Sequence, residues 1–398
     1  MDRVARELKL DRAEVRKRNL IPAGKMPYTK PLKNRAGAPL VLDSGDYPAC
    51  QDEVLAAIDY AGFPARQAAA RREGRHIGIG FAHGAKGTGR GPFESGTVRI
   101  APSGRVSVYS GALAMGQGIN TALAMIAAEQ LGVPLERVDV ITGDTAFVSL
   151  GMGGFASRQT IMAGTSVQMA SLKVREKAIK TAAHLLEAAE ADLELADGGV
   201  RVAGTNRSVT LAAIARALRG APGFSLPAGV EAGLEANCQW QSDQMSFANC
   251  FHACEVDVDV ETGGVRILRY VALQDSGKLI NPMIVEGQVH GSVAHGIGNA
   301  LYEWMGYDEN AQPVTTTFAD YLMPTSTEVP SIELLFKESP TPFNPLGIKG
   351  VGEGGIVPVA ASLASAVENA LEPFGVRITQ VPMKPVRILE LIGRGTRE

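Results

Sequence analysis

Cysteine is scarce in this chain, and its spacing excludes the common metal centres built from thiolates. The 398 residues contain four cysteines, of which only Cys250 and Cys254 lie close together. A structural zinc site or a cysteine-held iron–sulfur cluster needs a second close pair, which the sequence lacks. His290 and His295 are five residues apart, so they do not share one helix face as a zinc pair would. We therefore expect reduced thiols and no metal held directly by side chains.

A strong charge imbalance, abundant aromatic residues and long apolar runs are also missing. The net charge is −3 and aromatic residues make up 6%, which argues against an electrostatic or base-stacking interface with nucleic acid. No apolar run reaches the length that spans a bilayer. The chain starts with a charged amphipathic segment instead of a secretory signal. We expect a globular cytoplasmic protein without a nucleic-acid partner or a membrane span.

The familiar phosphate-binding and hydrolytic motifs are absent. Gly277-Lys278 lacks the upstream glycine of a phosphate-binding P-loop, because that position is Ala272. The segment Gly78-Ile79-Gly80 does not continue as a dinucleotide fingerprint. No Ser/His/Asp triad can be argued from the spacing. These absences exclude the simplest nucleotide-binding and hydrolase classes.

Glycine, in contrast, is plentiful and clustered. There are 45 glycines in 398 residues, well above the usual ~7%. In four segments a glycine stands beside an amide, hydroxyl or carboxylate side chain at the start of an expected helix. Helix N-termini with such side chains offer donors to a large anionic ligand. A single segment of this kind is more often a plain helix cap, whereas the set favours a cofactor site: 115–118, 153–160, 286–288 and 352–355.

Glu353 occupies the most informative of these segments. Four glycines surround this one carboxylate between Lys349 and Gly355, and an apolar helix containing Pro358 follows. Glycine permits positive φ and a close approach to a ligand, and a helix start favours the ionised form of a carboxylate. The combination suits a general base next to a cofactor. The alternative is a solvent-exposed turn with an ordinary glutamate.

The pattern of elements predicts an α+β fold in which helices pack on mixed sheets. Strands and helices are interleaved, but adjacent strands also form a hairpin around Glu261 to Gly264. The expected strands cover 76–81, 96–100, 106–109, 138–142, 254–260, 265–273 and, at a sheet edge, 332–336. The expected helices cover two short stretches within 1–20 and then 51–71, 120–131, 157–191, 287–302 and 358–371.

Taken in order, these segments resemble the molybdenum-binding large subunit of the xanthine oxidase/aldehyde oxidase family, particularly its carbon-monoxide-dehydrogenase-like branch. The resemblance covers essentially the whole chain and is specific as a joint pattern. It is carried by Met115-Gly-Gln-Gly118, Ile141-Thr-Gly-Asp144, Ser157-Arg-Gln-Thr160, Asp275, Ile280 to Gln288, Asn344-Pro-Leu-Gly347 and Lys349 to Gly355.

The resemblance implies a role for each matching residue. Glu353 matches the catalytic base, and Ala156 lies where a small residue abuts the molybdenum. The expected cofactor is molybdopterin cytosine dinucleotide, whose dithiolene holds the metal without a protein ligand. Phe81 is expected at the wall of the substrate pocket. The remaining matches are expected to contact the cofactor: Met115, Gly116, Gln117, Ser157, Gln159, Thr160 and Gln288.

The resemblance also implies a domain organisation. Residues 1–75 match a helical lead and linker, the tail of a first molybdenum domain. Residues 76–398 match a second molybdopterin-binding domain with two subdomains that separate near 195–245. The family's upstream loops, which complete the cofactor cavity, have no counterpart here. A further polypeptide carrying the first molybdenum domain is therefore an expected partner.

The expected activity is oxidation of an aldehyde or an N-heterocycle, with water as the oxygen source. Electrons would leave through an iron–sulfur small subunit and an FAD-binding medium subunit. Oxidation of carbon monoxide is an alternative that this sequence does not decide. In the family, that reaction depends on a copper-binding cysteine in a loop that this chain does not contain. A cofactor-free structural or assembly subunit is the third alternative, against which the intact Gln117, Gln288 and Glu353 argue.

Overall fold

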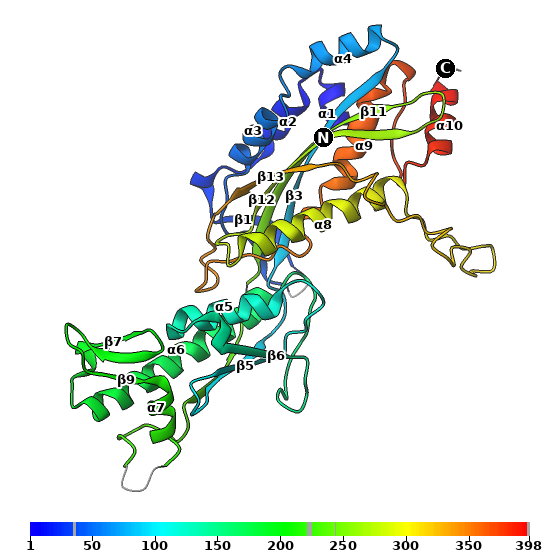
Figure 1. Ribbon diagram of the computed structural model, residues 1–398. Helices are drawn as coiled ribbons and strands as arrows, with labels where there is room; N and C mark the ends of the chain where they lie inside the picture. Colours follow the sequence, from blue (N-terminus) through cyan, green and yellow to red (C-terminus); the bar gives the residue numbers. More distant parts are fainter. Residues whose placement is uncertain (35–36, 221–224, 243, 396–398) are drawn as a thin grey trace.

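The chain folds into two lobes, each built on its own four-stranded sheet (Figure 1). The computed structural model describes residues 1–34, 37–220, 225–242 and 244–395. We call the larger lobe the three-layer lobe; it contains β3, β11–β13, α1–α4 and α8–α10. The smaller, two-layer lobe contains β4–β10 and α5–α7. The mixture of sheets and packed helices confirms the predicted α+β class.

The sheet of the three-layer lobe has the strand order β13-β12-β11-β3. Its centre is the long antiparallel pair β11 (Ser246–Val258) and β12 (Val265–Asp275), which confirms the predicted hairpin. The strand β3 (His76–Thr88) pairs with β11 without a break in register. The strand β13 (Ile332–Lys337) lies at the opposite edge, as the sequence predicted, and runs parallel to β12.

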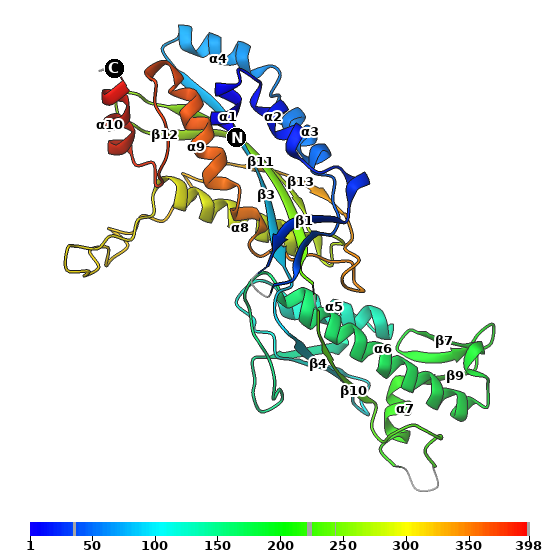
Figure 2. The same ribbon diagram turned by 180° about the vertical axis from the view of Figure 1, so that it is seen from behind.

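Helices cover both faces of this sheet, as the view from behind also shows (Figure 2). On one face lie α2 (Arg12–Asn19), α3 (Tyr47–Ala57) and α4 (Phe63–Arg72), whose apolar side chains meet Phe81, Phe251 and Leu273. On the other face lie α8 (Pro282–Leu301), α9 (Val359–Ala370) and α10 (Pro385–Gly395). The short α1 (Asp2–Glu7) precedes α2. Burial of both apolar faces stabilises the sheet as the centre of the lobe.

The two-layer lobe packs two helices on a sheet of order β10-β4-β5-β6. The helix α5 (Ile119–Leu131) lies beside the 28-residue α6 (Gln159–Leu186). Both contribute small and aliphatic residues to one continuous core. The sheet comprises β4 (Glu94–Ile100), β5 (Val106–Ser110), β6 (Val138–Thr142) and β10 (Glu235–Trp240). A side sheet follows with β7 (Leu193–Ala196), β8 (Gly199–Val202), β9 (Ser208–Thr210) and then α7 (Leu211–Ala217).

The chain passes between the lobes twice, from β3 to β4 and from β10 to β11. These passages lie at 88–94 and 240–246. The expected subdivision near 195–245 therefore includes the second passage, whereas the first lies further upstream. Residues 193–217 pack onto the core of the two-layer lobe.

Several predicted boundaries were wrong. The single helix expected over 51–71 is two helices, α3 and α4, separated by Asp59 with φ +55° and by Gly62. Pro64, in the first turn of α4, fits a helix start and not an interior. The segment 286–288 does not open a helix, because α8 begins at Pro282 with Asn281 as its cap. The connector before α3 contains an unpredicted hairpin of β1 (Tyr28–Lys33) and β2 (Pro39–Leu42).

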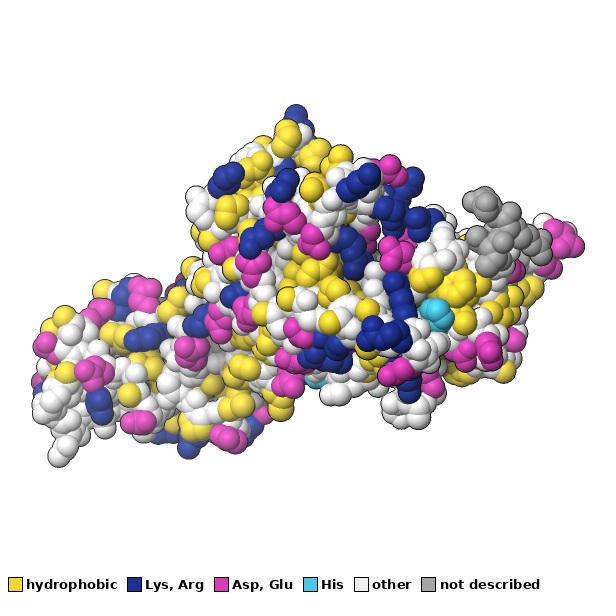
Figure 3. Space-filling view, turned by 90° about the horizontal axis from the view of Figure 1, so that it is seen from above, with side chains coloured by type: hydrophobic (Ala, Val, Ile, Leu, Met, Phe, Trp, Pro, Cys, Tyr) yellow, Lys and Arg dark blue, Asp and Glu magenta, His cyan; other side chains and the backbone are white. Residues whose placement is uncertain are grey.

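The surface shows how the charges are distributed. Acidic and basic side chains are interspersed on the face seen in Figure 3, in keeping with the net charge of −3. Within the described ranges, no helix is both long enough and apolar enough to cross a membrane.

Candidate cofactor and active site

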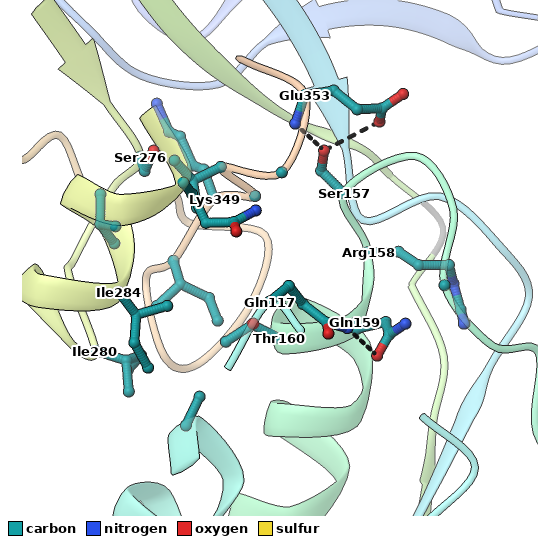
Figure 4. A pocket seen from close by; sticks show the side chains of 18 of the residues that line it. Gln117, Ser157, Arg158, Gln159, Thr160, Ser276, Ile280, Ile284, Lys349 and Glu353 are labelled. Carbon is teal, nitrogen blue, oxygen red and sulfur yellow. Dashed lines mark hydrogen bonds between the residues drawn. The ribbon is translucent and has the colours of Figure 1, made fainter. Parts of the chain in front are cut away.

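A cavity of about 450 Å³ opens where loops of the two lobes meet. The two-layer lobe contributes the loop before α5 and the loop that leads into α6. The three-layer lobe contributes residues 276–288, including the first turns of α8, and the segment 348–353. Figure 4 shows side chains from these separate elements around one space.

The cavity unites segments that are far apart in the sequence. The residues assigned to the base and the cofactor from the resemblance line it, except Gly116, which lies between two lining residues. The lining members of that set are Met115, Gln117, Ala156, Ser157, Gln159, Thr160, Gln288 and Glu353.

Two glutamines form a hydrogen-bonded pair at the wall of the two-layer lobe. Gln117 Nε2 lies 3.2 Å from Gln159 Oε1, which also accepts from the backbone N–H of Leu113 at 3.2 Å (Figure 4). Gln117 Oε1 accepts from the N–H of Met115 at 2.6 Å, so its amide closes the loop before α5. Gln159 Nε2 is buried and has no hydrogen-bond partner among the described residues. A buried donor without a partner is available to a ligand.

The loop that leads into α6 has a strained backbone. Ala156 and Ser157 both have φ +49°, a conformation that non-glycine residues rarely adopt. The segment around Gly350 presses against this loop: a Cβ added to Gly350 would lie 2.1 Å from the carbonyl oxygen of Ser157. Glycine is therefore required at position 350 for the two loops to touch.

The contact between the loops brings Ser157 to Glu353. The Ser157 hydroxyl accepts from the backbone N–H of Glu353 at 3.0 Å and donates to its Oε2 at 3.0 Å (Figure 4). Lys86 Nζ lies 3.1 Å from the same Oε2. Glu353 is also the residue before a 3₁₀ turn, η4 (Gly354–Ile356), and its side chain is half exposed. The carboxylate is therefore held at one oxygen by a hydroxyl and an ammonium group.

A buried ion pair that the sequence did not reveal anchors the base of the same loop. Arg158 and Glu94 are both fully buried, and Arg158 Nη1 lies 2.8 Å from Glu94 Oε2. Arg158 also donates to the carbonyl oxygens of Arg90 at 2.7 Å and Gly153 at 2.9 Å. These bonds tie the start of α6 to the beginning of β4. The only sequence signal was the position of Arg158 between two predicted ligand residues.

A buried lysine supports the segment that carries Glu353. Lys349 Nζ donates to the Ser44 carbonyl oxygen at 3.1 Å and lies 3.9 Å from Asp43 Oδ2, and both charged side chains are fully buried. Sequence analysis placed Lys349 in the informative loop but gave it no role. It also gave no role to other residues that line the cavity: Ser276, Lys278, Ile280, Asn281 and Ile284.

Phe81 does not lie at the cavity, and its expected place at a substrate-pocket wall was wrong. It is 1% exposed and packs in the core between the sheet and the first helices. Its ring is 4.7 Å from the Arg16 guanidinium carbon and stacks near Phe251 at 6.1 Å between centroids. Side chains alternate along a strand, and at position 81 the side chain faces α2.

Comparison with known proteins decides the family. A sequence profile of the molybdopterin cofactor-binding domain matches residues 53–330. The chain belongs to the molybdopterin cofactor-binding family. The 6-hydroxypseudooxynicotine dehydrogenase complex subunit gamma of Paenarthrobacter nicotinovorans is 37% identical over 97% of this chain and 48% of that protein. The carbon monoxide dehydrogenase large chain of Hydrogenophaga pseudoflava is 34% identical over 98% of this chain and 49% of its own length.

Solved structures agree with this assignment. The reconstituted CO dehydrogenase from Oligotropha carboxidovorans matches with a TM-score of 0.90 and 32% identity over 99% of this chain and 50% of that one. Quinoline 2-oxidoreductase from Pseudomonas putida 86 matches with a TM-score of 0.89 and 37% identity, over 98% of this chain and 50% of that one. The resemblance inferred from the loops is confirmed. The chain spans about half the length of these relatives.

The residues of the cavity fit a molybdopterin group. The amides of Gln117, Gln159 and Gln288 line the wall. Gln117 Nε2 donates to the Leu113 carbonyl oxygen and to Gln159 Oε1, whereas Gln159 Nε2 is a buried donor that the described residues leave without a partner. The start of α6 adds backbone N–H groups that have no partner within the helix. Among the described residues that line the cavity, Glu353 is the one carboxylate. A donor-rich wall of this kind suits an acceptor-rich pterin and its phosphates.

Proposed function

We propose that this chain is the C-terminal part of a molybdopterin-dependent hydroxylase or dehydrogenase large subunit, which oxidises an aldehyde or an N-heterocycle. The observation that carries the proposal is the meeting of Glu353, Gln288 and the start of α6 around one cavity. An N-heterocycle is favoured by the nicotine 6-hydroxylase large subunit of Paenarthrobacter nicotinovorans, which is 34% identical, and by quinoline 2-oxidoreductase, which is 37% identical. The bound cofactor supplies the redox chemistry and the water-derived oxygen.

In this proposal, Glu353 is the general base. Its Oε1 makes no hydrogen bond or ion pair with the part of the chain that the structure describes, whereas Oε2 is held by Ser157 and Lys86. One oxygen is thus anchored and the other remains available to accept a proton. Positioned proton transfer of this kind contributes roughly 10²–10⁴-fold to a rate.

The other assigned residues bind and orient the cofactor. Gln117 and Gln288 hydrogen-bond the pterin, and Met115 and Gly116 shape the loop that holds Gln117 in place. Ala156 leaves room beside the molybdenum because its side chain is a single methyl group. Ser157, Gln159 and Thr160 contact the pterin and the phosphates at the positive end of α6. The proposed form of the cofactor is molybdopterin cytosine dinucleotide.

We propose that a polypeptide carrying the first molybdenum domain covers the mouth of the cavity. The loops that lead into α5 and α6, from which Met115 and Phe155 line the cavity, expose large apolar side chains. Leu113, Met115, Phe147, Leu150, Met152 and Phe155 are between 40% and 61% exposed. Apolar groups gathered in this way are typical of a surface that another chain covers. An iron–sulfur small subunit and an FAD-binding medium subunit would accept the electrons, in a cytoplasmic complex. Residues 1–75 would then belong with the first domain and 76–398 form the second.

The proposal is tested on the complex isolated with its partner subunits. Molybdenum is measured by mass spectrometry, and cytidine monophosphate is measured after acid release from the cofactor. The proposal predicts both in stoichiometric amounts, with turnover of an N-heterocycle or aldehyde. A complex that is stable but contains neither molybdenum nor cytidine nucleotide contradicts it and favours a structural or assembly subunit.

Oxidation of carbon monoxide is a second candidate, favoured by the large-chain relative from Hydrogenophaga pseudoflava at 34% identity. Copper analysis of the isolated complex and a carbon monoxide assay distinguish the two candidates. An N-heterocycle oxidase is expected to turn over its substrate without copper.

A further inference from the structure

Lys86 contacts the carboxylate of Glu353 from outside the cavity. Its Nζ lies 3.1 Å from Glu353 Oε2, and the two side chains are 25% and 48% exposed. Lys86 is not among the residues that line the cavity. Its ammonium also donates to the Gly87 carbonyl oxygen at 3.1 Å, which fixes the side chain near the end of β3.

A rigid strand supports this lysine. Lys86 pairs with Ala248 in the unbroken ladder of β3 and β11. Gly84 lies two positions earlier on the same face of β3. A Cβ on Gly84 would lie 2.9 Å from Val357 and 3.3 Å from Pro358, which follow Glu353 in the chain. This face of β3 therefore packs against the residues that follow Glu353. The regular pairing of β3 with β11 fixes the backbone of Lys86 next to that segment.

We propose that Lys86 is a positioning residue that orients the carboxylate of Glu353. The inference rests on the proposed function of Glu353 as the base. Lys86 and Ser157 both hold Oε2, so Oε1 is left to accept the proton. A base held in one orientation transfers the proton more efficiently than one whose carboxylate rotates.

The other charged and titratable groups near Glu353 are engaged elsewhere or contact its loop only through the backbone. Lys349 points to Ser44 and Asp43, and Arg158 pairs with Glu94. Cys250 Sγ donates to the Gly354 carbonyl oxygen at 3.0 Å, and burial raises the pKa of this thiol to about 12, so it stays neutral. Lys278 lines the cavity but forms no ion pair with the carboxylate among the described residues. Lys86 is the one cation that touches the Glu353 carboxylate within the described ranges.

The first experiment measures kcat and KM separately in the isolated complex. Replacement of Lys86 by methionine is expected to lower kcat about threefold while KM changes little, because the base is less well oriented for the chemical step. Lys86→Arg, which can make the same contact, restores the wild-type kcat. The matched control is Lys180→Met, which removes an equally paired lysine on α6, 2.8 Å from Glu176.

The second experiment uses a readout other than activity. Lysines of the chain are reductively methylated with ¹³C, and the Lys86 signal is assigned by its loss in Lys86→Arg. The chemical shift of this signal is expected to differ between wild type and Glu353→Gln, which removes the charged neighbour. A Lys86 signal that Glu353→Gln leaves unchanged, or a kcat that Lys86→Met leaves unchanged, overturns the inference. Full turnover by Glu353→Gln instead overturns the proposed function, so the two failures are distinguishable.

Discussion

The hydroxyl of Ser157 lies 3.0 Å from both the backbone nitrogen and the carboxylate Oε2 of Glu353, although the two residues are 196 positions apart. One hydroxyl thus fixes the backbone and the side chain of the proposed base at the same time. Ser157 reaches it from a backbone with φ +49°, next to Ala156 in the same conformation. The loop before α6 therefore both shapes the cavity and orients the base.

Ser157→Ala removes the donor to the carboxylate and is expected to lower kcat about tenfold, because a hydrogen bond to a charged group contributes about 1.5 kcal/mol or more. KM should change less than kcat, since the base acts on the chemical step. Steady-state kinetics of the complex measure both. The control is Ser365→Ala, whose hydroxyl contacts Asp2 on the far side of the lobe. Equal kcat in Ser157→Ala and wild type would show that the hydroxyl does not orient the base.

Arg158→Met is expected to destabilise the fold by about 3–5 kcal/mol, because it leaves the carboxylate of Glu94 buried without its partner. The double variant with Glu94→Gln should recover part of this loss. Chemical denaturation measures the free energy of unfolding. Arg99→Met, which breaks the exposed pair with Glu235, is the matched control and should cost less than about 1 kcal/mol. Similar losses in both variants would contradict a stabilising role for the buried pair.

Gly350→Ala is expected to separate the two loops, since its Cβ would lie 2.1 Å from the Ser157 carbonyl oxygen. We expect a loss of stability of about 1–3 kcal/mol and a complex with strongly reduced molybdenum content and kcat. Gly291→Ala is the control, because its Cβ would meet open space on α8. An alanine in a helix interior should leave stability unchanged or raise it by up to about 1 kcal/mol. Normal molybdenum content in Gly350→Ala would show that the contact is dispensable.

His252 makes the fold sensitive to acid. It is fully buried beside the Tyr270 hydroxyl, 3.0 Å from Nδ1, and burial lowers its pKa to about 3. In the unfolded chain the histidine binds a proton near its ordinary pKa of ~6.5. The stability that the fold gains by burying neutral His252 is therefore fully present above that pH and is lost as the pH falls. Between the pKa of the unfolded chain and that of the folded chain, the loss is at most about 1.4 kcal/mol per pH unit.

The measurement is the free energy of unfolding at pH 6.5 and 4.5. Wild type is expected to lose about 2 kcal/mol more over this interval than His252→Gln, which cannot take up the proton. His290→Gln, at a partly exposed position on α8, should behave like wild type. Equal pH dependence of wild type and His252→Gln would contradict this account.

Local patterns in the sequence predicted much of the fold and the set of loops that forms the site. The hairpin of β11 and β12, the start of α5 and the long α6 follow from turn residues and apolar spacing. Glu353 and the cavity glutamines were also found from their segments. The predicted start of α8, Gly287, lies five residues after the true start at Pro282. Asn281 caps the helix and Pro282 occupies its first turn, and the prediction did not use this signal.

What could not be predicted were the long-range pairs. Lys86 with Glu353, and Arg158 with Glu94, are far apart in the sequence and meet only in the folded chain. Likewise, Phe81 was assigned to the cavity from resemblance alone. Its true direction depends on which face of β3 the first helices cover. Such pairings depend on tertiary structure and leave no periodic signal in the sequence.

The most direct test of the central claim is the turnover of Glu353→Gln in the isolated complex, compared with wild type at matched molybdenum content. Glutamine keeps the shape of the side chain but cannot accept the proton. We predict that kcat falls by roughly 10²–10⁴-fold while molybdenum and cytidine nucleotide remain at wild-type amounts. Turnover equal to that of wild type would contradict the assignment of Glu353 as the base.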